Sequence, residues 1–425
     1  MSSVGNLAKG AGVYVIASII NAAVPFLLLP VLTRYLSPAE YGEVALFNVW
    51  VSLAGALCGL SVHAAANRKY FDYKEKQNEM GEFIVACLTI LAISSAILFV
   101  VTLLFANPLS ELLNFPVKWL LLGIPFAAAN FVIQIRLGQW QVREKPIVFG
   151  IFQISQSLLN VGLSLLLVII FTLGVTGRIA GYSAAVFSFS LIALLLLYRD
   201  RLLTFSWRPD LIKEALRFGV PLVPHIIGAF LLLSIDRAVI SALLGTDAAG
   251  IYMVALQVGL VASLLLDAIN KAFSPWLFKN LTDSSAEKKE SVVKVTYGLY
   301  ALLFVGAGLG FLIGDDILLL LVGPDFTAAA DIVGWVILGQ ALRGAYLFVT
   351  NYIFYTKRTG VIAVITIISG IVNTILLFVM LELHGIVGAA YALCMSMTIQ
   401  WLATWIIAQR LVRMPWAFYL KKNIP

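Results

Sequence analysis

The chain has 425 residues, of which 61% are hydrophobic and only 12% are charged. A soluble globular protein averages about 45–50% apolar and about 25% charged residues, so the composition excludes the soluble classes and the surplus apolar surface must face lipid. The formal net charge of +7 does not indicate a nucleic-acid partner, because the Lys and Arg residues gather in short loops between apolar runs. Such basic loops favour anionic membrane lipids as their partner.

Twelve apolar runs follow one another along the chain. A hydrocarbon core about 30 Å thick needs about 20 helical residues, and each run reaches that length. We therefore predict an all-α membrane protein with twelve transmembrane helices. In chain order the predicted spans are 11–33, 41–63, 83–106, 117–141, 146–172, 177–198, 214–244, 248–271, 292–314, 328–352, 360–382 and 385–410.

The first run, 11–33, is too long for a signal peptide and contains Pro25 and Pro30, so we predict a retained helix. The seventh run also carries two prolines, Pro221 and Pro224. Proline removes a backbone donor and clashes with the preceding turn. We expect both spans to bend, either as fixed kinks used for packing or as moving hinges.

Basic residues assign the orientation, because cytoplasmic loops are enriched in Lys and Arg. The predicted outer segments carry Arg34, Lys118 and Arg178. The predicted inner segments carry many more: Lys9; Arg68, Lys69, Lys74 and Lys76; Arg143 and Lys145; Arg199, Arg201, Arg208, Lys213 and Arg217; Lys279, Lys288, Lys289 and Lys294; Lys357 and Arg358; Arg410, Arg413, Lys421 and Lys422. Both termini are predicted to be cytoplasmic.

The longest basic connection divides the predicted spans six and six. We predict an N-terminal six-helix lobe at 1–200, a cytoplasmic linker at 201–213 and a C-terminal six-helix lobe at 214–425. Residues 36–42 (LSPAEYG) match residues 244–250 (LGTDAAG), and Asn160 in the fifth span corresponds to Asn373 in the eleventh. Because six is even, both lobes insert the same way round. This indicates a parallel pseudo-repeat with the substrate path between the lobes.

Ionisable side chains within spans are costly in hydrocarbon and normally face a cavity or a partner. The candidate substrate-binding cations are Arg34, Arg136, Arg237, Lys271 and Arg343. Cations outnumber acids, which suits a phosphate or pyrophosphate that an arginine can bind with two parallel hydrogen bonds. Two alternatives remain open: Lys271 reaches the cytoplasmic headgroups, and Arg136 contacts headgroups instead of lining a cavity.

Asp236 and Asp267 are the only acids deep in the predicted spans, so they are the candidate ion-coupling residues. Asp267 also lies one helical turn before Lys271, where the two side chains are able to pair. Gln153, Gln156, Asn160 and Ser164 form a polar stripe in the fifth span. Such a stripe either lines a wet path or joins neighbouring helices.

The sequence contains no nucleotide loop, nucleophile elbow or metal motif. His63, His225 and His384 share no common spacing, and Cys58, Cys87 and Cys394 lie apart inside apolar runs. We therefore predict no metal, no cofactor and no catalytic residue. A secondary carrier is favoured over an enzyme or an ATP-driven pump.

Residues 7–12 (LAKGAG) and 25–42 (PFLLLPVLTRYLSPAEYG) resemble the Wzx-type polysaccharide flippases of the multidrug/oligosaccharidyl-lipid/polysaccharide exporter superfamily. Residues 234–237 (SIDR) are similar to the seventh span of the same family. By position, Arg34 and Arg237 match cations of the family pattern.

The resemblance implies a carrier of the bacterial inner membrane. Such a carrier turns an undecaprenyl-pyrophosphate-linked oligosaccharide repeat unit from the cytoplasmic to the periplasmic leaflet by alternating access. The unit serves surface polysaccharides such as O-antigen and lipopolysaccharide, and other polysaccharide-assembly membrane proteins are implied partners.

Two other functions remain as alternatives. A multidrug cation exporter of the same superfamily is expected to place carboxylates in its first spans, and no carboxylate between Glu43 and Glu144 falls inside a predicted span. A polysaccharide polymerase or membrane glycosyltransferase usually has a large outer loop that carries acids or a base. Each predicted outer loop here is short.

The topology has a direct test. In a background without Cys58, Cys87 and Cys394, a cysteine at Ser206 should resist a membrane-impermeant thiol reagent in intact cells, because its loop is predicted to be cytoplasmic. A cysteine at Thr327 should react. Labelling is read by mass shift on a gel, and the reverse pattern would overturn the twelve-span model.

Overall fold

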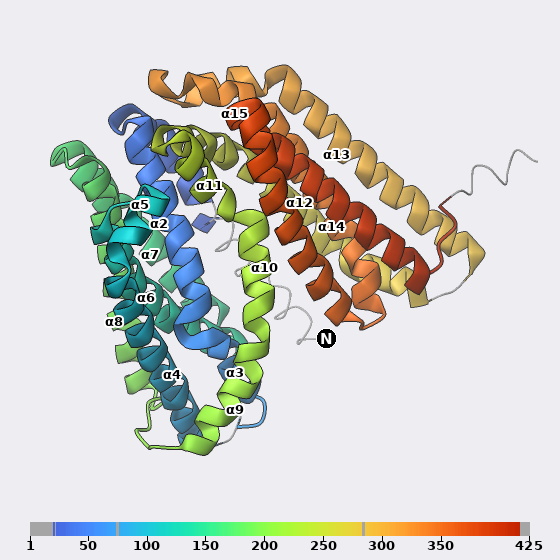
Figure 1. Cartoon of the computed structure of the whole chain (residues 1–425). Coiled ribbons are helices and arrows are strands. Elements are labelled where there is room, and N and C mark those ends of the chain that lie inside the picture. Colours follow the sequence, from blue (N-terminus) through green and yellow to red (C-terminus); the bar gives the residue numbers. More distant parts are fainter. Residues whose placement is uncertain (1–19, 22, 74–75, 283–284, 417–425) are drawn as a thin grey trace, which may run out of the picture. The chain divides into compact units, whose positions relative to one another are not determined.

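The computed structural model describes residues 20–21, 23–73, 76–282 and 285–416, and it contains helices but no strand over these residues (Figure 1). Ten of the described helices are long and apolar enough to cross a membrane. The expectation of an all-α membrane protein is confirmed. Of the first predicted span, 11–33, the structure describes residues 20–21 and 23–33, and this part includes a shorter apolar helix, Ala23–Tyr35.

The helices before the middle of the chain correspond closely to the predicted spans. The predicted fourth and sixth spans are α6 and α8, and the second begins with α2. The structure gives α2 as Pro38–Leu57, α3 as Val62–Lys69, α4 as Gln77–Leu104, α5 as Ala106–Leu113, α6 as Val117–Val142, α7 as Pro146–Leu165, α8 as Gly174–Arg199 and α9 as Pro209–Gly219.

The remaining helices include three that are longer than a single span, α12, α13 and α15. In chain order the remaining helices are α10 (Val223–Leu233), α11 (Ile235–Leu244), α12 (Thr246–Thr282), α13 (Ala286–Leu321), α14 (Ala330–Tyr355) and α15 (Thr359–Leu411). Gly385 interrupts α15 with φ 57° and ψ −144°, a conformation that glycine adopts easily. The break lies between the predicted spans 360–382 and 385–410. The total of twelve spans stays a prediction.

The described chain forms two compact units. The first contains the described residues up to Phe230 together with Arg237–Gly250, and the second contains Leu231–Asp236 and the described residues from Ile251. This division lies later in the chain than the linker predicted at 201–213. The reason is that α9 packs on the first unit, where Glu214 accepts a hydrogen bond from Lys69 at 2.6 Å. The two six-helix lobes stay a prediction.

Glu40 fixes the beginnings of two helices of the first unit. It completes a capping box with Ser37 at the start of α2, in which each residue binds the backbone N–H of the other. Its second carboxylate oxygen accepts a hydrogen bond from the Val175 N–H at 3.1 Å, in the first turn of α8. The carboxylate thus supplies partners for N–H groups that a helix leaves unpaired.

Two glycines allow the start of α2 to touch the start of α12. A Cβ atom on Gly42 would lie 2.0 Å from the carbonyl oxygen of Thr246, and one on Gly250 would lie 2.0 Å from the carbonyl oxygen of Pro38. Small residues permit this close approach of helix backbones in membranes. The contact is reciprocal: Gly42 meets the first turn of α12, and Gly250 meets the first residue of α2. The repeat itself stays a prediction.

The seventh span is interrupted twice. A 3-10 turn at Val220–Leu222 separates α9 from α10 and contains Pro221, so the expected bend is present there. A second interruption at Ser234 separates α10 from α11. Pro25 and Pro30, by contrast, lie in a helix that runs unbroken from Ala23 to Tyr35.

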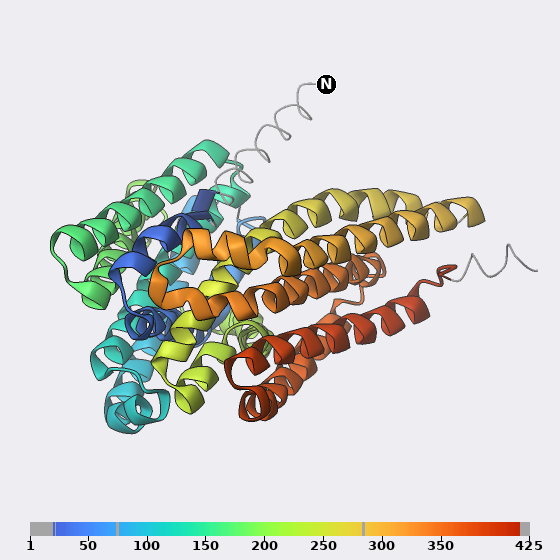
Figure 2. The same ribbon diagram turned by 90° about the horizontal axis from the view of Figure 1, so that it is seen from above.

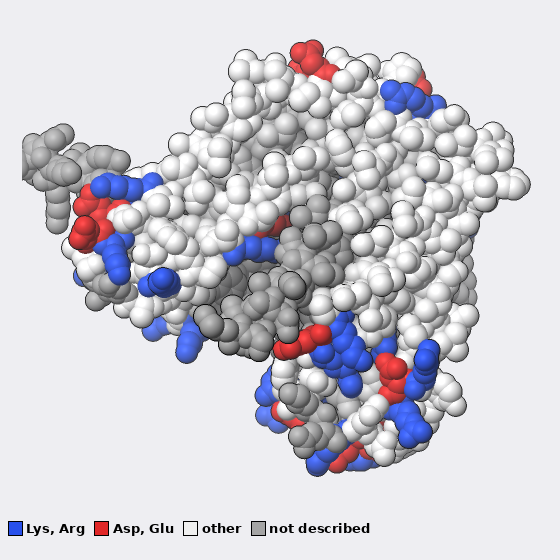
Figure 3. All heavy atoms as spheres, turned by 180° about the vertical axis from the view of Figure 1, so that it is seen from behind, with Lys and Arg blue, Asp and Glu red and all other residues white. Residues whose placement is uncertain are grey.

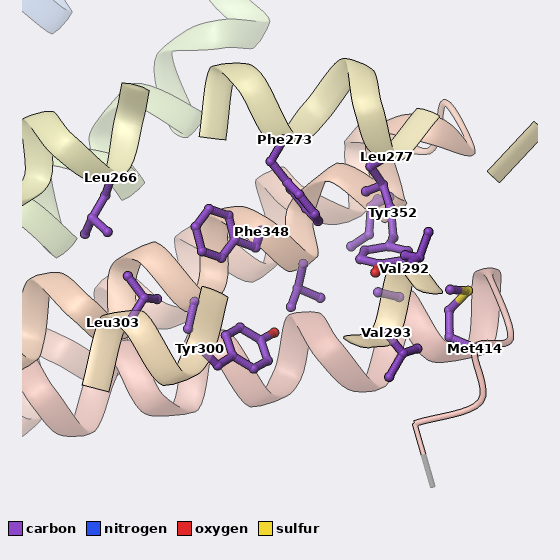
Figure 4. Close-up of a cluster of buried hydrophobic side chains, with 14 of the residues drawn as sticks. Leu266, Phe273, Leu277, Val292, Val293, Tyr300, Leu303, Phe348, Tyr352 and Met414 are labelled. Atoms are coloured by element: carbon purple, nitrogen blue, oxygen red, sulfur yellow. The ribbon is translucent and has the colours of Figure 1, made fainter. Parts of the chain in front are cut away.

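The core of the second unit is built from aromatic and aliphatic side chains of α12 to α15 (Figure 4). The rings of Phe273 and Phe348 meet edge to face with centroids 5.4 Å apart, a geometry worth about 0.5–1.5 kcal/mol beyond area burial. The helix α14 packs along both α13 and α15 (Figure 2). The contact of Phe273 with Phe348 places α12 beside α14.

Charged residues gather in patches on the surface, with broad uncharged areas between them (Figure 3). Large apolar side chains such as Leu104, Leu312 and Leu320 are more than 70% exposed. In water such exposure is unfavourable, whereas in a bilayer these side chains meet lipid tails. The surface therefore agrees with a multi-pass membrane protein.

The close glycine contact predicts a stability effect. Gly42→Ala and Gly250→Ala should each lower the free energy of unfolding by about 1–3 kcal/mol or more, because the new methyl group overlaps a backbone oxygen that has no side-chain freedom. Gly162→Ala is the control, since a Cβ there meets nothing within 4 Å. Thermal unfolding of the purified protein in nanodiscs gives the measurement. Equal stability of all three variants would contradict the contact.

Candidate functional site

Arg178 is a buried cation of the first unit, on α8 and only 8% exposed. Its Nη1 donates to Asn160 Oδ1 at 2.8 Å and to Ser164 Oγ at 2.6 Å, both on α7. Its guanidinium carbon lies 5.3 Å from the centroid of the Tyr182 ring. Within the described residues Arg178 makes no ion pair, and its Nε has no hydrogen-bond partner.

A buried arginine that is bound only to neutral oxygens keeps its full positive charge. An unpaired charge costs several kcal/mol in a low-dielectric interior, so such groups normally mark a functional position. The sequence reasoning missed this role, because it counted Arg178 among the cations of the outer loops. The available signal was the polar pair Asn160 and Ser164, which lie one turn apart in the predicted stripe.

The rest of the α7 stripe is also polar inside the first unit. Ser157 Oγ donates to Asn21 Oδ1 in the described part of the first predicted span. The Oε1 atom of Gln153 is buried without a hydrogen-bond partner within the described residues. Part of the stripe therefore joins helices, as one interpretation expected, while Asn160 and Ser164 orient a cation.

Arg343 is a cation of the second unit that is likewise held by a neutral group. It lies on α14, is partly buried, and donates from Nη1 to Ser263 Oγ of α12 at 3.1 Å. Eight residues further along α14, Asn351 Nδ2 donates to Asn270 Oδ1 of α12 at 2.7 Å. Polar side chains thus line the contact of α12 with α14. Like Arg178, Arg343 makes no ion pair within the part of the chain that the structure describes.

Asp267 lies on the same face of α12 as Ser263, four residues further on. The structure forms no ion pair between Asp267 and Lys271, although the sequence allowed one. Lys271 is exposed and Asp267 is partly buried. The structure thus brings Arg343, Asp267 and Lys271 into the same unit. Arg343 is hydrogen-bonded to Ser263, and Asp267 lies one helical turn after Ser263.

The other predicted site residues lie elsewhere. Arg136 on α6 is buried and forms an ion pair with Asp200, at the end of α8. Its guanidinium carbon also lies 4.2 Å from the centroid of the Trp140 ring. Arg34 is exposed at the end of the first described helix, where its Nη1 donates to the Pro30 carbonyl. These contacts give Arg136 a structural partner, and its substrate role stays a prediction.

Asp236 and Arg237 follow the interruption at Ser234. Asp236 is buried and Arg237 is partly buried. The two residues belong to different units, Asp236 to the second and Arg237 to the first. Their predicted roles in ion coupling and in substrate binding stay predictions.

Some cations outside the spans have carboxylate partners close by. The hydrogen bond from Arg68 lowers the pKa of the Asp72 carboxyl after α3. The hydrogen bonds to Asp210 raise the pKa of the Arg208 guanidinium before α9, and Glu82 accepts from Arg208 at 2.7 Å. These cations have carboxylate partners, which sets them apart from Arg178 and Arg343.

An open cavity of about 640 Å³ lies in the first unit, at the predicted outer end. Its lining includes three carboxylates, Glu43, Glu111 and Asp247. Glu43 accepts a hydrogen bond from Trp119 Nε1 at 3.0 Å. An acidic lining repels phosphate, so this cavity does not suit an anionic substrate. Among the described residues no group of three His, Cys, Asp or Glu side chains is arranged to hold a metal ion.

Comparisons with known proteins agree on one family. The family model described as "Polysaccharide biosynthesis protein" matches residues 7–281. An uncharacterized membrane protein of Haemophilus influenzae is 26% identical over 372 residues, covering 86% of this chain and 88% of the relative. The probable low-salt glycan biosynthesis flippase Agl15 of Haloferax volcanii is 22% identical over 409 residues, covering 93% of this chain and 82% of the relative.

Solved structures show the same fold. An inward-facing multidrug resistance transporter of the MATE family, in the MOP superfamily, superposes with a TM-score of 0.73 at 14% identity, over 95% of this chain and 96% of that chain. A MOP superfamily transporter from Pyrococcus furiosus, described by the reverse polarity of its binding pocket, gives a TM-score of 0.62 at 14% identity, over 95% of each chain. At this identity the likeness concerns the fold alone.

The pair of Arg136 and Asp200 predicts a stability effect. Their side chains are 3% and 39% exposed, so Arg136→Gln should lower the free energy of unfolding by about 1–2 kcal/mol. Asp200→Asn should add little to Arg136→Gln, because both remove the same pair. Lys76→Gln is the control, since the Lys76–Glu79 pair is exposed. Thermal unfolding and transport per folded molecule are measured, and lost transport at unchanged stability would assign Arg136 to the substrate.

Proposed function

The chain belongs to the polysaccharide biosynthesis protein family, and on that premise we propose that it is a flippase for undecaprenyl-pyrophosphate-linked oligosaccharide repeat units. It moves each unit from the cytoplasmic to the periplasmic leaflet of a bacterial inner membrane by alternating access, for surface polysaccharides such as O-antigen or lipopolysaccharide. Its membrane-embedded helices supply the path, and other polysaccharide-assembly membrane proteins are its expected partners.

One observation carries the proposal: each unit contains an arginine within a helix that is held by neutral oxygens. Arg178 is bound by Asn160 and Ser164, and Arg343 is bound by Ser263. Their positive charge is not cancelled by a carboxylate, so an anion is the natural partner. A pyrophosphate offers two adjacent phosphates, and the planar guanidinium group binds such oxygens in pairs.

The glycan part of the substrate requires a different chemistry. Sugars are recognised by hydrogen bonds from amides and hydroxyls, which the polar residues on α7, α12 and α14 supply. The amides Asn270 and Asn351 are paired with each other in the present conformation. We propose that such amides exchange their mutual hydrogen bonds for bonds to the glycan.

Direction requires a driving force, because the sequence carries no nucleotide-binding motif. Asp267 is a partly buried acid with no ion pair to Lys271, and Asp236 is buried beside the interruption at Ser234. An acid inside the membrane is a candidate to bind a proton or a sodium ion. We propose both as ion-coupling residues, with Asp236 as the main candidate.

A multidrug cation exporter shares the fold and is the second candidate. The charge of Arg178 in the first unit is unfavourable for a lipophilic cation. Glu82, near the start of α4, is already paired with Arg208. The charge of Arg178 and this pairing favour an anionic substrate over a cationic drug.

The arginines provide the test. In a strain that lacks the gene, the surface polysaccharide should be lost and its lipid-linked unit should accumulate. Arg178→Gln and Arg343→Gln should fail to restore the polysaccharide although the protein is present in the membrane, and Arg343→Lys should restore it in part, because lysine keeps the charge but not the planar fork. Arg410→Gln, at the exposed end of α15, is the matched control.

A binding measurement with the purified protein completes the test. Undecaprenyl pyrophosphate should raise the melting temperature of the wild type, uncharged undecaprenol should not, and both arginine variants should lose the shift. Normal polysaccharide in the deletion strain would refute the function. Full complementation by both Gln variants would show that these arginines only pack against their neighbours.

A further inference from the structure

The interruption of the seventh span leaves backbone groups in need of partners. In an unbroken helix the carbonyl of Leu231 would accept a hydrogen bond from the N–H of Ile235. Here α10 ends at Leu233 and α11 begins at Ile235, with Ser234 between them. In the hydrocarbon core no water is present to bind the carbonyls of the last turn of α10, so the protein must supply a donor.

Asn373 of α15 is that donor. Its Nδ2 lies 3.1 Å from the carbonyl oxygen of Leu231 and 3.5 Å from that of Leu232. The side chain is 3% exposed. Because a carbonyl only accepts hydrogen bonds, the group that faces both oxygens has to be the amide NH₂.

The other end of the same amide is also bound. Ser396 Oγ donates to Asn373 Oδ1 at 2.9 Å, with the Leu393 carbonyl 3.0 Å away as an alternative acceptor. Ser396 is completely buried and lies on α15 beyond the interruption at Gly385. Ser396 in the second half of α15 thus orients Asn373 in the first half, and Asn373 donates to the last turn of α10.

We propose that Asn373 is a positioning residue that maintains the interruption at Ser234 and thereby places Asp236. Only an amide meets both requirements, since it donates to the Leu231 carbonyl and accepts from Ser396 at the same time. The inference deepens the proposed function, on which the coupling role of Asp236 rests. The hydrogen bond from Asn373 to the end of α10 does not itself depend on that function.

Removing the donor favours an unbroken helix over the interruption between α10 and α11. Without Asn373 Nδ2, the carbonyl of Leu231 regains a partner only by pairing with the N–H of Ile235, which joins α10 to α11. Successive helical residues turn by about 100°, so closing the interruption redirects the side chain of Asp236. The asparagine therefore controls which way this acid points.

A distance measurement tests the helix geometry. Spin labels are placed at His225→Cys and Leu243→Cys, both exposed, in a background without Cys58, Cys87 and Cys394. An unbroken helix would separate the two labelled backbone positions by about 27 Å. Pulsed electron resonance in nanodiscs should give a shorter distance in the parent protein.

Asn373→Leu, which keeps the size but removes both polar groups, should move the distance toward that of the unbroken helix. Thr374→Val is the matched control, because Thr374 Oγ1 donates to Gly370 of its own helix at 2.9 Å. It should leave the distance unchanged. If Asn373→Leu does not fold, Ser396→Ala should give a smaller shift in the same direction, because the amide loses its orientation.

A transport measurement tests the action on Asp236. The substrate is the lipid-linked oligosaccharide extracted from the deletion strain, reconstituted with purified protein in liposomes. Asn373→Leu should lower flipping per folded molecule by about ten- to a hundredfold, as expected for misplacement by about 1 Å. It should also weaken the dependence on the ion gradient. Adding Asp236→Asn should then cause little further loss, and Asn373→Gln should recover part of the rate.

The outcomes separate the two proposals. An unchanged distance in both Asn373→Leu and Ser396→Ala would overturn the role of Asn373, whatever the substrate proves to be. A shifted distance with additive losses from Asn373→Leu and Asp236→Asn would refute its action through Asp236. A wild-type protein that flips no lipid-linked oligosaccharide would refute the proposed function. The spin-label distances would still test whether Asn373 maintains the interruption at Ser234.

Discussion

The hydrocarbon core of the bilayer contains no water, so each carbonyl, amide and charge inside it must find its partner within the protein. This constraint shapes both the interruptions and the cations of the chain. At Ser234 the helix stops, and the Asn373 amide serves the freed carbonyls. At Arg178 a guanidinium group lies among helices, and Asn160 and Ser164 orient it. Where the partner is neutral, a charge remains available for a ligand.

The buried and loop arginines differ in whether their partners are charged or neutral. Arg136 pairs with Asp200, and Arg208 with Asp210 and Glu82. These contacts neutralise the charge and join helices to loops. Arg178 and Arg343 are instead bound to amide or hydroxyl oxygens. A membrane protein that carries a pyrophosphate gains from such arginines, because the ligand completes a charge balance that the fold leaves open.

Asn160 and Asn373 show how one residue type serves two tasks. Asn160 and Asn373 occupy matching positions in the predicted fifth and eleventh spans. In the first unit Asn160 accepts from Arg178, whereas in the second unit Asn373 donates to the end of α10. The difference arises because an amide both donates and accepts, so its role is set by the neighbour that folding brings to it.

Hydrophobic runs and basic loops alone predicted the helical membrane fold, because bilayer thickness sets helix length and backbone pairing excludes other structures. The match of 36–42 with 244–250 stays a prediction of a repeat, and only the structure shows that the two segments touch at Gly42 and Gly250. The sequence does not predict the partners of its charges: it gives no sign that Arg136 pairs with Asp200, that Arg178 is bound by Asn160, or that Arg343 is bound by Ser263. Only the tertiary structure decided these pairings, because residues far apart in the chain meet through helix packing, which periodicity along one helix does not encode.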